Sequence, residues 1–357
     1  MSVKSYKDKN GKTKYYCSFY FTDYNGQRKR KKLEGFYLLR EAKQAEKDFL
    51  QKVSGSSNIS FKNLYAIYLD DCKTRLKPSS IPSKEYIMKN QCLPFFGDTP
   101  INEITPQMVR TWQNQLLSHN PAYKKTYLRA CNVHLSALFN YAVKYYGMKK
   151  NPVQITGTLG TTKSGRMDFY TVNEFKKFME NMKDSKPLQM AFELLFFTGI
   201  RSGELLAVTL SDFDVTAETL TINKTLNIIK GKISITTPKT TKSNRVITLP
   251  HTAALHLQEY INSMIEPQPQ ERLFSSLSKY KLSHTAKITA KKAGLKPIRL
   301  HDFRHSHASL LIELGFSPLL ISQRLGHEDI QTTLAIYSHL YPNKANEVSA
   351  KLNDFMI

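Results

Sequence analysis

The feature that most constrains this chain is its division by two polar breaks. The first, Ser54-Gly55-Ser56-Ser57-Asn58, has the composition of a flexible linker. The second runs from Gly147 to Asp168 and contains Asn151-Pro152 and several Thr and Gly. The spacing of the apolar residues changes across each break. We therefore predict three domains and a linker, with these bounds: domain 1–57, domain 58–155, linker 156–168 and domain 169–357.

The first segment has the pattern of a small sheet followed by a helix. Asn10-Gly11 and Asn25-Gly26 are tight-turn pairs because both residue types tolerate a positive φ. Between them, Tyr15 to Phe21 is a β-prone run. After the second turn, apolar residues at helical spacing predict a helix; they are Leu39, Ala42, Ala45, Phe49 and Val53. We expect three strands and one helix.

The other two segments differ from the first and from each other. From Ser60 onward the apolar spacing is helical, and a later set is spaced alternately by four and three residues: Tyr123, Tyr127, Ala130, His134, Ala137 and Tyr141. This predicts an all-α domain, in which His134 packs rather than reacts. The last segment is mixed α/β but mainly α. Thr171 and Glu174 form a capping box there, and short strands are expected near residues 220–223, 233–237 and 245–249.

Charge points to the partner of this chain. The 357 residues carry a net charge of +23, and the first 168 hold 29 basic against 12 acidic side chains, whereas the remaining 189 hold 23 against 17. Such an excess favours binding to phosphate backbones. Hydrophobic residues make up 41%, which excludes a wholly disordered chain. No apolar run is long enough to cross a membrane. The lysine-rich start has no apolar signal region, and the four cysteines form no C-x-x-C pair, so we expect a cytosolic protein.

Three clusters of basic residues are the candidate DNA contacts. The run Arg28-Lys29-Arg30-Lys31-Lys32 falls in a predicted strand, which places cations on both faces of the sheet. Lys163 and Arg166 lie in the second linker. Lys239, Lys242 and Arg245 lie on what we predict to be a hairpin tip between two strands, and a lysine there could donate a proton.

Four short motifs in the last segment suggest a shared chemistry. In order along the chain they are Thr198-Gly199-Ile200-Arg201-Ser202-Gly203-Glu204, the lysine loop, His301-Asp302-Phe303-Arg304-His305, and Leu325-Gly326-His327 followed by Tyr337. Two guanidinium groups can neutralise the oxygens of one phosphodiester in its transition state. Lysine and histidine can move protons, and a tyrosine phenol can attack phosphorus. Arg201 is expected beside a helix N-terminus, and His301 and Arg304 on one face of a helix and free to meet a ligand.

A zinc helix is an alternative for His301 and His305, which are four residues apart as in H-E-x-x-H. Asp302 stands where that motif has its glutamate, and no third ligand follows at a suitable spacing. With no dedicated carboxylate cluster, two-metal hydrolysis is poorly supported as well. We therefore predict no metal and no cofactor.

The order of these motifs resembles the tyrosine recombinase family, and more specifically the phage-type integrases. The resemblance extends over the whole chain. The first segment resembles their arm-type DNA-binding domain, and the second resembles their helical core-binding domain through Phe95-Phe96-Gly97-Asp98 and Ile101 to Pro106. The resemblance implies a mixed α/β, mainly α, catalytic domain in the third segment.

The resemblance also implies a role for each residue. Tyr337 would be the nucleophile that forms a 3′-phosphotyrosyl bond, and Arg201 and Arg304 would hold the scissile phosphate. Lys239 would protonate the leaving 5′ oxygen, with Lys242 as its rival. His301 would assist proton transfer to or from the phenol, and His327 would hydrogen-bond the phosphate. Tyr341 is the rival nucleophile, but it precedes Pro342, where the helix is expected to end.

The implied activity is site-specific integration and excision of a mobile element, such as a phage, by strand exchange through a Holliday junction. The implied partners are core-type and arm-type DNA sites, three further copies in a homotetramer, an excisionase and a host DNA-bending protein, in the cytoplasm of a bacterial host and without a membrane. Residues 346–355 are expected to dock on a neighbouring copy. A type IB-like topoisomerase and a non-catalytic DNA-binding regulator remain as alternatives.

Overall fold

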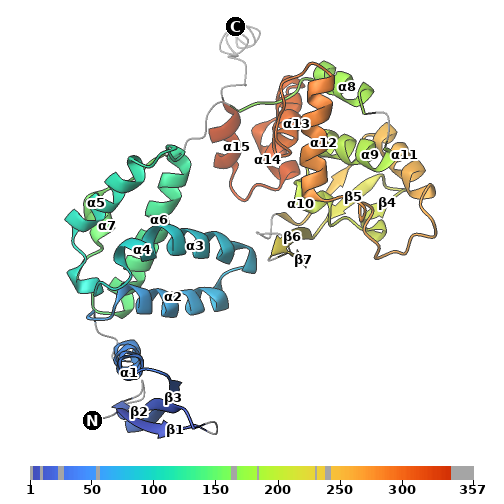
Figure 1. The fold of residues 1–357 in the computed structure, drawn as a ribbon. Coiled ribbons are helices and arrows are strands. Elements are labelled where there is room, and N and C mark those ends of the chain that lie inside the picture. Colours follow the sequence, from blue (N-terminus) through green and yellow to red (C-terminus); the bar gives the residue numbers. More distant parts are fainter. Residues whose placement is uncertain are drawn as a thin grey trace, which may run out of the picture. The chain divides into compact units, whose positions relative to one another are not determined.

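The computed structural model describes residues 3–8, 11–22, 28–53, 57–161, 167–182, 185–229, 231–237 and 243–338. The chain forms two compact units, residues 1–165 and 166–357 (Figure 1). The predicted architecture is confirmed: a small sheet with a helix, then a helical domain, then a mainly helical domain with short strands. None of the described helices has the length and apolar character that crossing a membrane requires.

The first unit begins with an antiparallel sheet of order β1-β2-β3, followed by α1. The bounds are β1 Val3–Lys7, β2 Thr13–Thr22, β3 Arg28–Phe36 and α1 Leu39–Val53. One face of the sheet packs on α1, where Phe19 and Phe21 contact Phe49 at 5.4 and 4.9 Å between ring centroids.

The rest of the first unit is helical. Its elements are α2 Phe61–Arg75, α3 Ile81–Ile87, a π-helical turn Met88–Cys92, α4 Leu93–Phe96, α5 Pro106–Leu117, α6 Lys125–Tyr145 and α7 Pro152–Thr156, with 3-10 turns at Pro78–Ser80 and Ile101–Glu103. The buried face of α6 includes Leu128, Cys131, Leu135 and Ala142. The residues of the predicted seam lie beside this face and are only partly buried. Burial lowers the pKa of His134 to about 4, which agrees with a packing role for this side chain.

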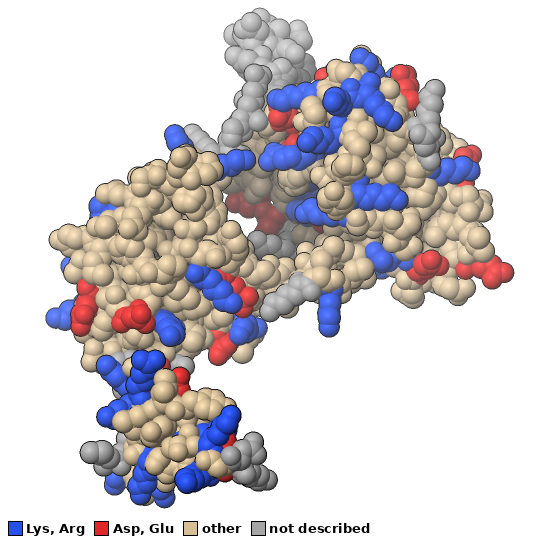
Figure 2. Space-filling view, in the orientation of Figure 1, with Lys and Arg blue, Asp and Glu red and all other residues tan. Residues whose placement is uncertain are grey.

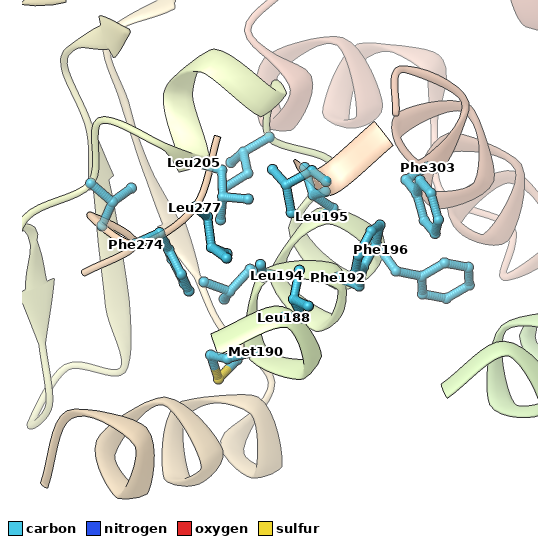
Figure 3. Packing of buried hydrophobic residues seen from close by; sticks show 14 of the residues in the cluster. Leu188, Met190, Phe192, Leu194, Leu195, Phe196, Leu205, Phe274, Leu277 and Phe303 are labelled. Carbon is cyan, nitrogen blue, oxygen red and sulfur yellow. The ribbon is translucent and has the colours of Figure 1, made fainter. Parts of the chain in front are cut away.

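Helix α9 lies in the core of the second unit, where it packs against α10, α11 and α13. Its helices are α8 Val172–Glu180, α9 Lys186–Thr198, α10 Ser202–Leu205, α11 His251–Asn262, α12 Lys279–Lys292, α13 Asp302–Glu313, α14 Pro318–Leu325 and α15 Ile330–Tyr337. Phe192 and Phe196 of α9 lie between Leu205 and Phe303 in the core (Figure 3). The capping box of Thr171 and Glu174 starts α8 as predicted.

The strands of the second unit form two small sheets. They are β4 Phe213–Asp214, β5 Thr219–Ile222, β6 Thr225–Ile229, β7 Lys232–Thr236 and β8 Arg245–Thr248, with a 3-10 turn at Leu210–Asp212. The sheets have the orders β4-β5-β8 and β6-β7. The prediction of a hairpin tip after β7 is wrong, because β7 pairs with β6 and β8 pairs with β5. The loop of Lys239 and Lys242 therefore joins two sheets.

Candidate active site

Arg201 is placed by a sharp break between two helices. Helix α9 ends at Gly199, whose φ of 65° lies in the left-handed region. A Cβ at this position would come within 2.7 Å of the His307 ring and 2.8 Å of Leu325, so glycine is required both by conformation and by space. The chain then turns into α10, with Arg201 as its N-cap residue. The Arg201 side chain is 37% exposed.

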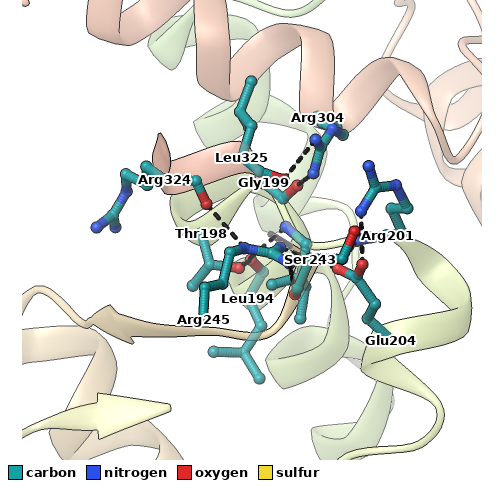
Figure 4. A network of polar contacts seen from close by, with 11 residues as sticks. Leu194, Thr198, Gly199, Arg201, Glu204, Ser243, Arg245, Arg304, Arg324 and Leu325 are labelled. Atoms are coloured by element: carbon teal, nitrogen blue, oxygen red, sulfur yellow. Dashed lines mark hydrogen bonds and ion pairs between the residues drawn. The ribbon is translucent and has the colours of Figure 1, made fainter. Parts of the chain in front are cut away.

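A buried carboxylate, Glu204, holds this arginine. Glu204 accepts hydrogen bonds from the Arg201 Nη1 at 2.7 Å and from the Arg245 Nη2 at 2.9 Å (Figure 4). Its side chain is 2% exposed. Burial by itself would raise the pKa of Glu204, but Arg245 and Arg201 outweigh burial and hold the pKa below its usual value. Glu204 is therefore ionised at neutral pH and fixes two guanidinium groups.

Arg245 does not lie where a DNA contact would be expected. Its guanidinium is buried and donates to the backbone oxygens of Arg324 and Ser243 as well as to Glu204. All of these partners belong to the protein. The geometry gives Arg245 a positioning role toward Glu204, and through Glu204 toward Arg201.

Arg304 is buried as well, in contrast to the free position expected from its helix. It is 2% exposed, and its Nη1 and Nη2 donate to the backbone oxygens of Gly199 and Leu325 at 2.8 and 2.6 Å. These oxygens lie at the C-terminal ends of α9 and α14, where the helix dipoles favour a cation. Burial, with Arg201 and Arg245 nearby, lowers the pKa of Arg304 to about 9, so this side chain stays charged at neutral pH.

His301 and His327 occupy the margin of the site. His301 is exposed at the start of α13 and lines, with Arg201, Lys279 and Arg299, a cleft of about 700 Å³ whose lining is rich in cations. His327 is half-buried, and its Nδ1 is 2.8 Å from the Oγ1 of Thr333. Burial, together with Arg304 and Arg201, lowers the pKa of His327 to about 3. His327 is therefore neutral, with one ring nitrogen fixed by Thr333.

Tyr337 ends α15 inside the protein. The side chain is 1% exposed and packs with Ala308, Ile312, Ile321 and Leu325. Its phenol oxygen lies 2.6 Å from the Nδ1 of His305. Burial raises the pKa of Tyr337, and the charge of Arg304 opposes this shift.

The remaining predicted residues divide into two groups. Lys163, Arg166, Lys239, Lys242, Tyr341 and residues 346–355 lie outside the described residues. The run from Arg28 to Lys32 is exposed along β3. Within the described parts of the chain, no group of three or more His, Cys, Asp or Glu side chains could hold a metal ion. The Nδ1 of His305, a ligand in the alternative zinc helix, is bonded to Tyr337.

Known proteins share the sequence pattern of this chain over its whole length. The model described as "Phage integrase family" matches residues 166–344, and the ICEBs1 integrase of Bacillus subtilis (strain 168) is 31% identical over 381 residues, with all of both chains covered. The chain belongs to the phage integrase family. Residues 60–117 of this integrase match the family's N-terminal SAM-like domain, and residues 4–53 match an arm DNA-binding domain. The family assignment carries with it tyrosine recombinase activity, the cleavage and rejoining of DNA at specific sites.

Other relatives agree with the assignment. A XerC-like tyrosine recombinase of Caldanaerobacter subterraneus is 26% identical, with all of both chains covered. The integrase of transposon Tn1549, solved with transposon right end DNA, has a TM-score of 0.69 at 19% identity and covers 83% of this chain and 99% of its own. A lambda integrase from a tetramer bound to a Holliday junction has a TM-score of 0.57 at 18% identity, covering 91% and 95%. At these identities the solved structures show the shared fold.

Three residues of the site are not among the catalytic candidates that the sequence indicates. Glu204 stands three residues after Arg201, at the third position of α10, and this spacing was its only signal. The spacing of His305 from His301 indicates only the alternative zinc helix. Thr333 lies one helical turn before Tyr337 on α15, where both side chains are buried, but threonine there is an ordinary packing residue in sequence.

Proposed function

We propose that this integrase cuts and rejoins DNA through a covalent bond between Tyr337 and a 3′ phosphate, and so integrates and excises a mobile element. The phenol oxygen attacks the scissile phosphorus, and the 5′ oxygen leaves. The new ester conserves the energy of the broken bond, so a second strand can be joined without ATP or a metal. Tyr341, which follows outside the described residues, is the rival nucleophile.

One observation carries the proposal: two arginines and a tyrosine converge from distant parts of the unit. Arg201 follows α9, Arg304 lies on α13 and Tyr337 ends α15. Arg304 donates to the backbone oxygen of Gly199, two residues before Arg201, and to that of Leu325, whose side chain packs with Tyr337. Two fixed cations can stabilise the charge that grows on the phosphate oxygens as the phenol attacks. His327 is oriented by Thr333 to donate a hydrogen bond to the same phosphate.

The proposed acid is Lys239, with Lys242 as the alternative. A protonated lysine can give its proton to the departing 5′ oxygen. DNA contacts are proposed for the Arg28 to Lys32 run, for Lys163 and Arg166 in the linker, and for Lys242. The proposed domains are 1–57 for arm-type sites, 58–155 for core-type sites and 169–357 for catalysis, with 156–168 between them.

The exposed face of the first sheet supports the arm assignment. Residues of β3 lie opposite residues of β2 in register, and Arg28, Arg30 and Lys32 share the face that carries Tyr16 and Tyr20. The guanidinium of Arg28 lies 4.7 Å from the Tyr20 ring, and the ammonium of Lys32 lies 4.8 Å from the Tyr16 ring. Lysine and arginine side chains crowd this part of the molecule (Figure 2). Cations held over aromatic rings on an open sheet face form a surface that can bind phosphates.

The assembly we propose is a homotetramer that acts on two duplexes and exchanges strands through a Holliday junction. The lambda integrase tetramer bound to such a junction has the same fold. An excisionase and a host DNA-bending protein complete the proposed partners, and the bacterial cytoplasm is the proposed location.

Covalent trapping tests the proposal. The substrate is a duplex that spans the junction of the element with its host DNA and is nicked near the cleavage site, so that the released fragment diffuses away. Wild type should accumulate a protein–DNA adduct in EDTA, and Tyr337→Phe should accumulate none. Tyr260→Phe is the matched control, because its hydroxyl is also buried and bonded, to the Leu273 oxygen at 2.6 Å. An adduct formed by Tyr337→Phe would move the nucleophile to Tyr341.

A supercoiled plasmid without any attachment sequence separates the remaining alternatives. A recombinase leaves it supercoiled, whereas a type IB-like topoisomerase relaxes it rapidly. A DNA-binding regulator gives neither relaxation nor an adduct with the nicked duplex.

A further inference from the structure

The last turn of α14 holds two arginines of the site through its backbone. The oxygen of Arg324 accepts a hydrogen bond from the Nε of Arg245 at 2.9 Å, and the oxygen of Leu325 accepts one from the Nη2 of Arg304 at 2.6 Å (Figure 4). Both oxygens lie at the end of a helix that stops before Gly326, where carbonyl groups have no partner within the helix. The position of this turn therefore helps to set the positions of both guanidinium groups.

The side chain of Arg324 joins this turn to three other elements. Its Nε donates to the Nε2 of His307 on α13 at 3.1 Å. Its Nη2 donates to the backbone oxygens of Phe197 on α9 and Thr248 on β8, at 3.3 and 3.1 Å. A planar guanidinium with donors on several edges can make all three bonds at once. One side chain thus connects four elements of the second unit.

Each partner of Arg324 lies three or four residues from an arginine of the site. The pairs are His307 and Arg304 on α13, Phe197 and Arg201 around the end of α9, and Thr248 and Arg245 on β8. Separations this short leave little freedom between the two residues in a helix, a strand or a tight turn. The bonds of Arg324 therefore fix the three segments that carry these arginines relative to α14.

All three acceptors are neutral groups of the protein. Burial, together with the charge of Arg324, lowers the pKa of His307 to about 3, so its ring is neutral. Arg324 is half-buried, and bonds to neutral groups offset the cost of taking a cation out of water less than bonds to a carboxylate would. An apolar side chain of similar length would avoid that cost. Stability alone therefore does not account for an arginine at this position, whereas a positioning role does.

We propose that Arg324 is a positioning residue of the reaction, which keeps the guanidinium groups of Arg201 and Arg304 at the spacing that one phosphate requires. This inference rests on the proposed function, in which these two arginines bind the scissile phosphate. The guanidinium of Arg324 lies at the opposite end of the network from that of Arg201 (Figure 4). Arg324 therefore acts through other residues of the protein.

Two paths lead from Arg324 to the phosphate. The shorter one is the next residue of α14, whose oxygen bonds Arg304. The longer one runs from the Arg324 oxygen to Arg245, and from there through Glu204 to Arg201. A misplacement of about 1 Å in a group that stabilises the transition state can cost roughly 10²-fold in rate. Loosening the last turn of α14 should therefore slow the chemical step.

The first measurement is the rate of adduct formation on the nicked duplex at saturating protein. Arg324→Met keeps an unbranched side chain but removes the donors. We expect the rate to fall by about 10- to 100-fold, with the dissociation constant of the duplex within about threefold of wild type. Lys224→Met is the matched control, because Lys224 is a half-buried cation of the same unit that is bonded to Thr209 and Asp212. Its rate should stay within about threefold of wild type, and the same small loss in Arg324→Met overturns the proposal.

The second measurement separates positioning from folding. It uses a nicked duplex whose scissile phosphate is a methylphosphonate, in which a methyl group replaces one non-bridging oxygen and removes the negative charge. The two arginines then have much less charge to stabilise, so their spacing matters less. Relative to wild type on the same substrate, Arg324→Met should lose no more than about threefold. An equal loss on both substrates would mean that Arg324 only supports the fold, and would overturn the proposal.

A second variant, Arg324→Lys, covers the case in which Arg324→Met does not fold. It keeps the charge, but one ammonium group cannot replace a guanidinium that spans three acceptors. We expect the same selective loss on the phosphate substrate, at a smaller size. A wild-type rate on that substrate would contradict the proposal, because a charge without the three directed bonds would then suffice.

The inference and the proposed function can fail separately. Arg304→Met is the reference for direct contact with the phosphate, and it should lose activity selectively on the phosphate substrate. If Arg304→Met loses equally on both substrates, its proposed role is wrong and the inference fails with it. If Arg304→Met is selective and Arg324→Met is not, only the inference is wrong.

Discussion

At the scale of single residues, the site depends on groups whose partners belong to the protein itself. Gly199 allows the chain to turn between α9 and α10, and its backbone oxygen also accepts a hydrogen bond from Arg304. Glu204 accepts hydrogen bonds from both Arg201 and Arg245, so Arg245 holds the carboxylate that positions Arg201. Substitutions at these positions should therefore affect both folding and catalysis.

Gly199→Ala should lower the free energy of unfolding by more than about 2 kcal/mol. A left-handed backbone costs a residue with a Cβ roughly 1–2 kcal/mol, and here the added Cβ also meets the His307 ring and Leu325. Gly315→Ala is the control, because Gly315 has a φ of 83° but open space where the Cβ would lie. Urea unfolding of both variants measures the difference, and equal losses would mean that the contact with His307 and Leu325 costs nothing.

Arg245→Met should lower the free energy of unfolding by about 3 kcal/mol, because it leaves part of a buried carboxylate uncompensated. It should also slow adduct formation, since Glu204 no longer holds Arg201 between two fixed partners. The double variant Arg245→Met/Glu204→Gln removes the stranded charge. We expect it to recover stability but not the adduct rate. If the two substitutions were additive in stability, Arg245 and Glu204 would not form an energetic pair.

At the scale of elements, strand β3 is the simplest source that we propose for DNA affinity. Alternate side chains of β3 lie on opposite faces of the sheet. One row lies on the face that packs on α1, and the other row, which we call the open row, lies on the face away from α1. In the open row the Arg30 Nε donates to the Ser18 Oγ at 3.0 Å, so its guanidinium is held on the sheet surface.

Replacing Arg30 and Lys32 together by Gln should weaken duplex binding and flatten its salt dependence. Each phosphate that the protein no longer neutralises should reduce the slope of log K against log salt by about 0.9. The control replaces Lys43 and Lys47 of α1, which are exposed and remove the same charge. Fluorescence anisotropy with a duplex from the end of the element, at several salt concentrations, measures both slopes. If the slope changed equally in both variants, β3 would contribute to DNA binding only through its net charge and not through specific phosphate contacts.

At the scale of the whole molecule, the two units should differ in their response to acid. The second unit contains two buried histidines and the half-buried His327, and burial lowers the pKa of all three: His305 to about 4, and His307 and His327 to about 3. The first unit has His134, at about 4. In the unfolded chain these rings protonate near pH 6.5. Between that pH and about 4 the unfolded state binds more protons, so stability that is complete above pH 6.5 is lost as the pH falls.

Lowering the pH from 7.5 to 5.5 should therefore destabilise the second unit more than the first. Each histidine can contribute up to about 1.4 kcal/mol per pH unit. Trp112, the only tryptophan of the chain, is buried in the first unit and reports its unfolding by fluorescence. Far-UV ellipticity follows both units. In urea unfolding, the part of the ellipticity transition that has no counterpart in Trp112 fluorescence reports the second unit. Its midpoint should fall further than the midpoint of the Trp112 transition, and equal shifts would contradict the prediction.

The sequence by itself determined what depends on local order and composition. Linker residues, turn pairs and apolar spacing predicted the three kinds of architecture, and the charge predicted a polyanionic partner. The motif order predicted which arginines and which tyrosine to examine. The prediction of a hairpin tip after β7 was wrong because strand pairing there is long-range. The strand β8 pairs with β5 and β7 pairs with β6, and no local sequence pattern encodes that choice.

Only the tertiary structure decided what surrounds each reactive group. A buried carboxylate draws Arg245 inward, although its neighbours in sequence suggested a surface loop. Arg304 is buried because two helix ends supply carbonyl oxygens to it. His305 meets Tyr337 across 32 residues of sequence. Contacts of this kind depend on which helices pack together, and their effect on charge and protonation depends on burial, which the order of residues along the chain does not contain.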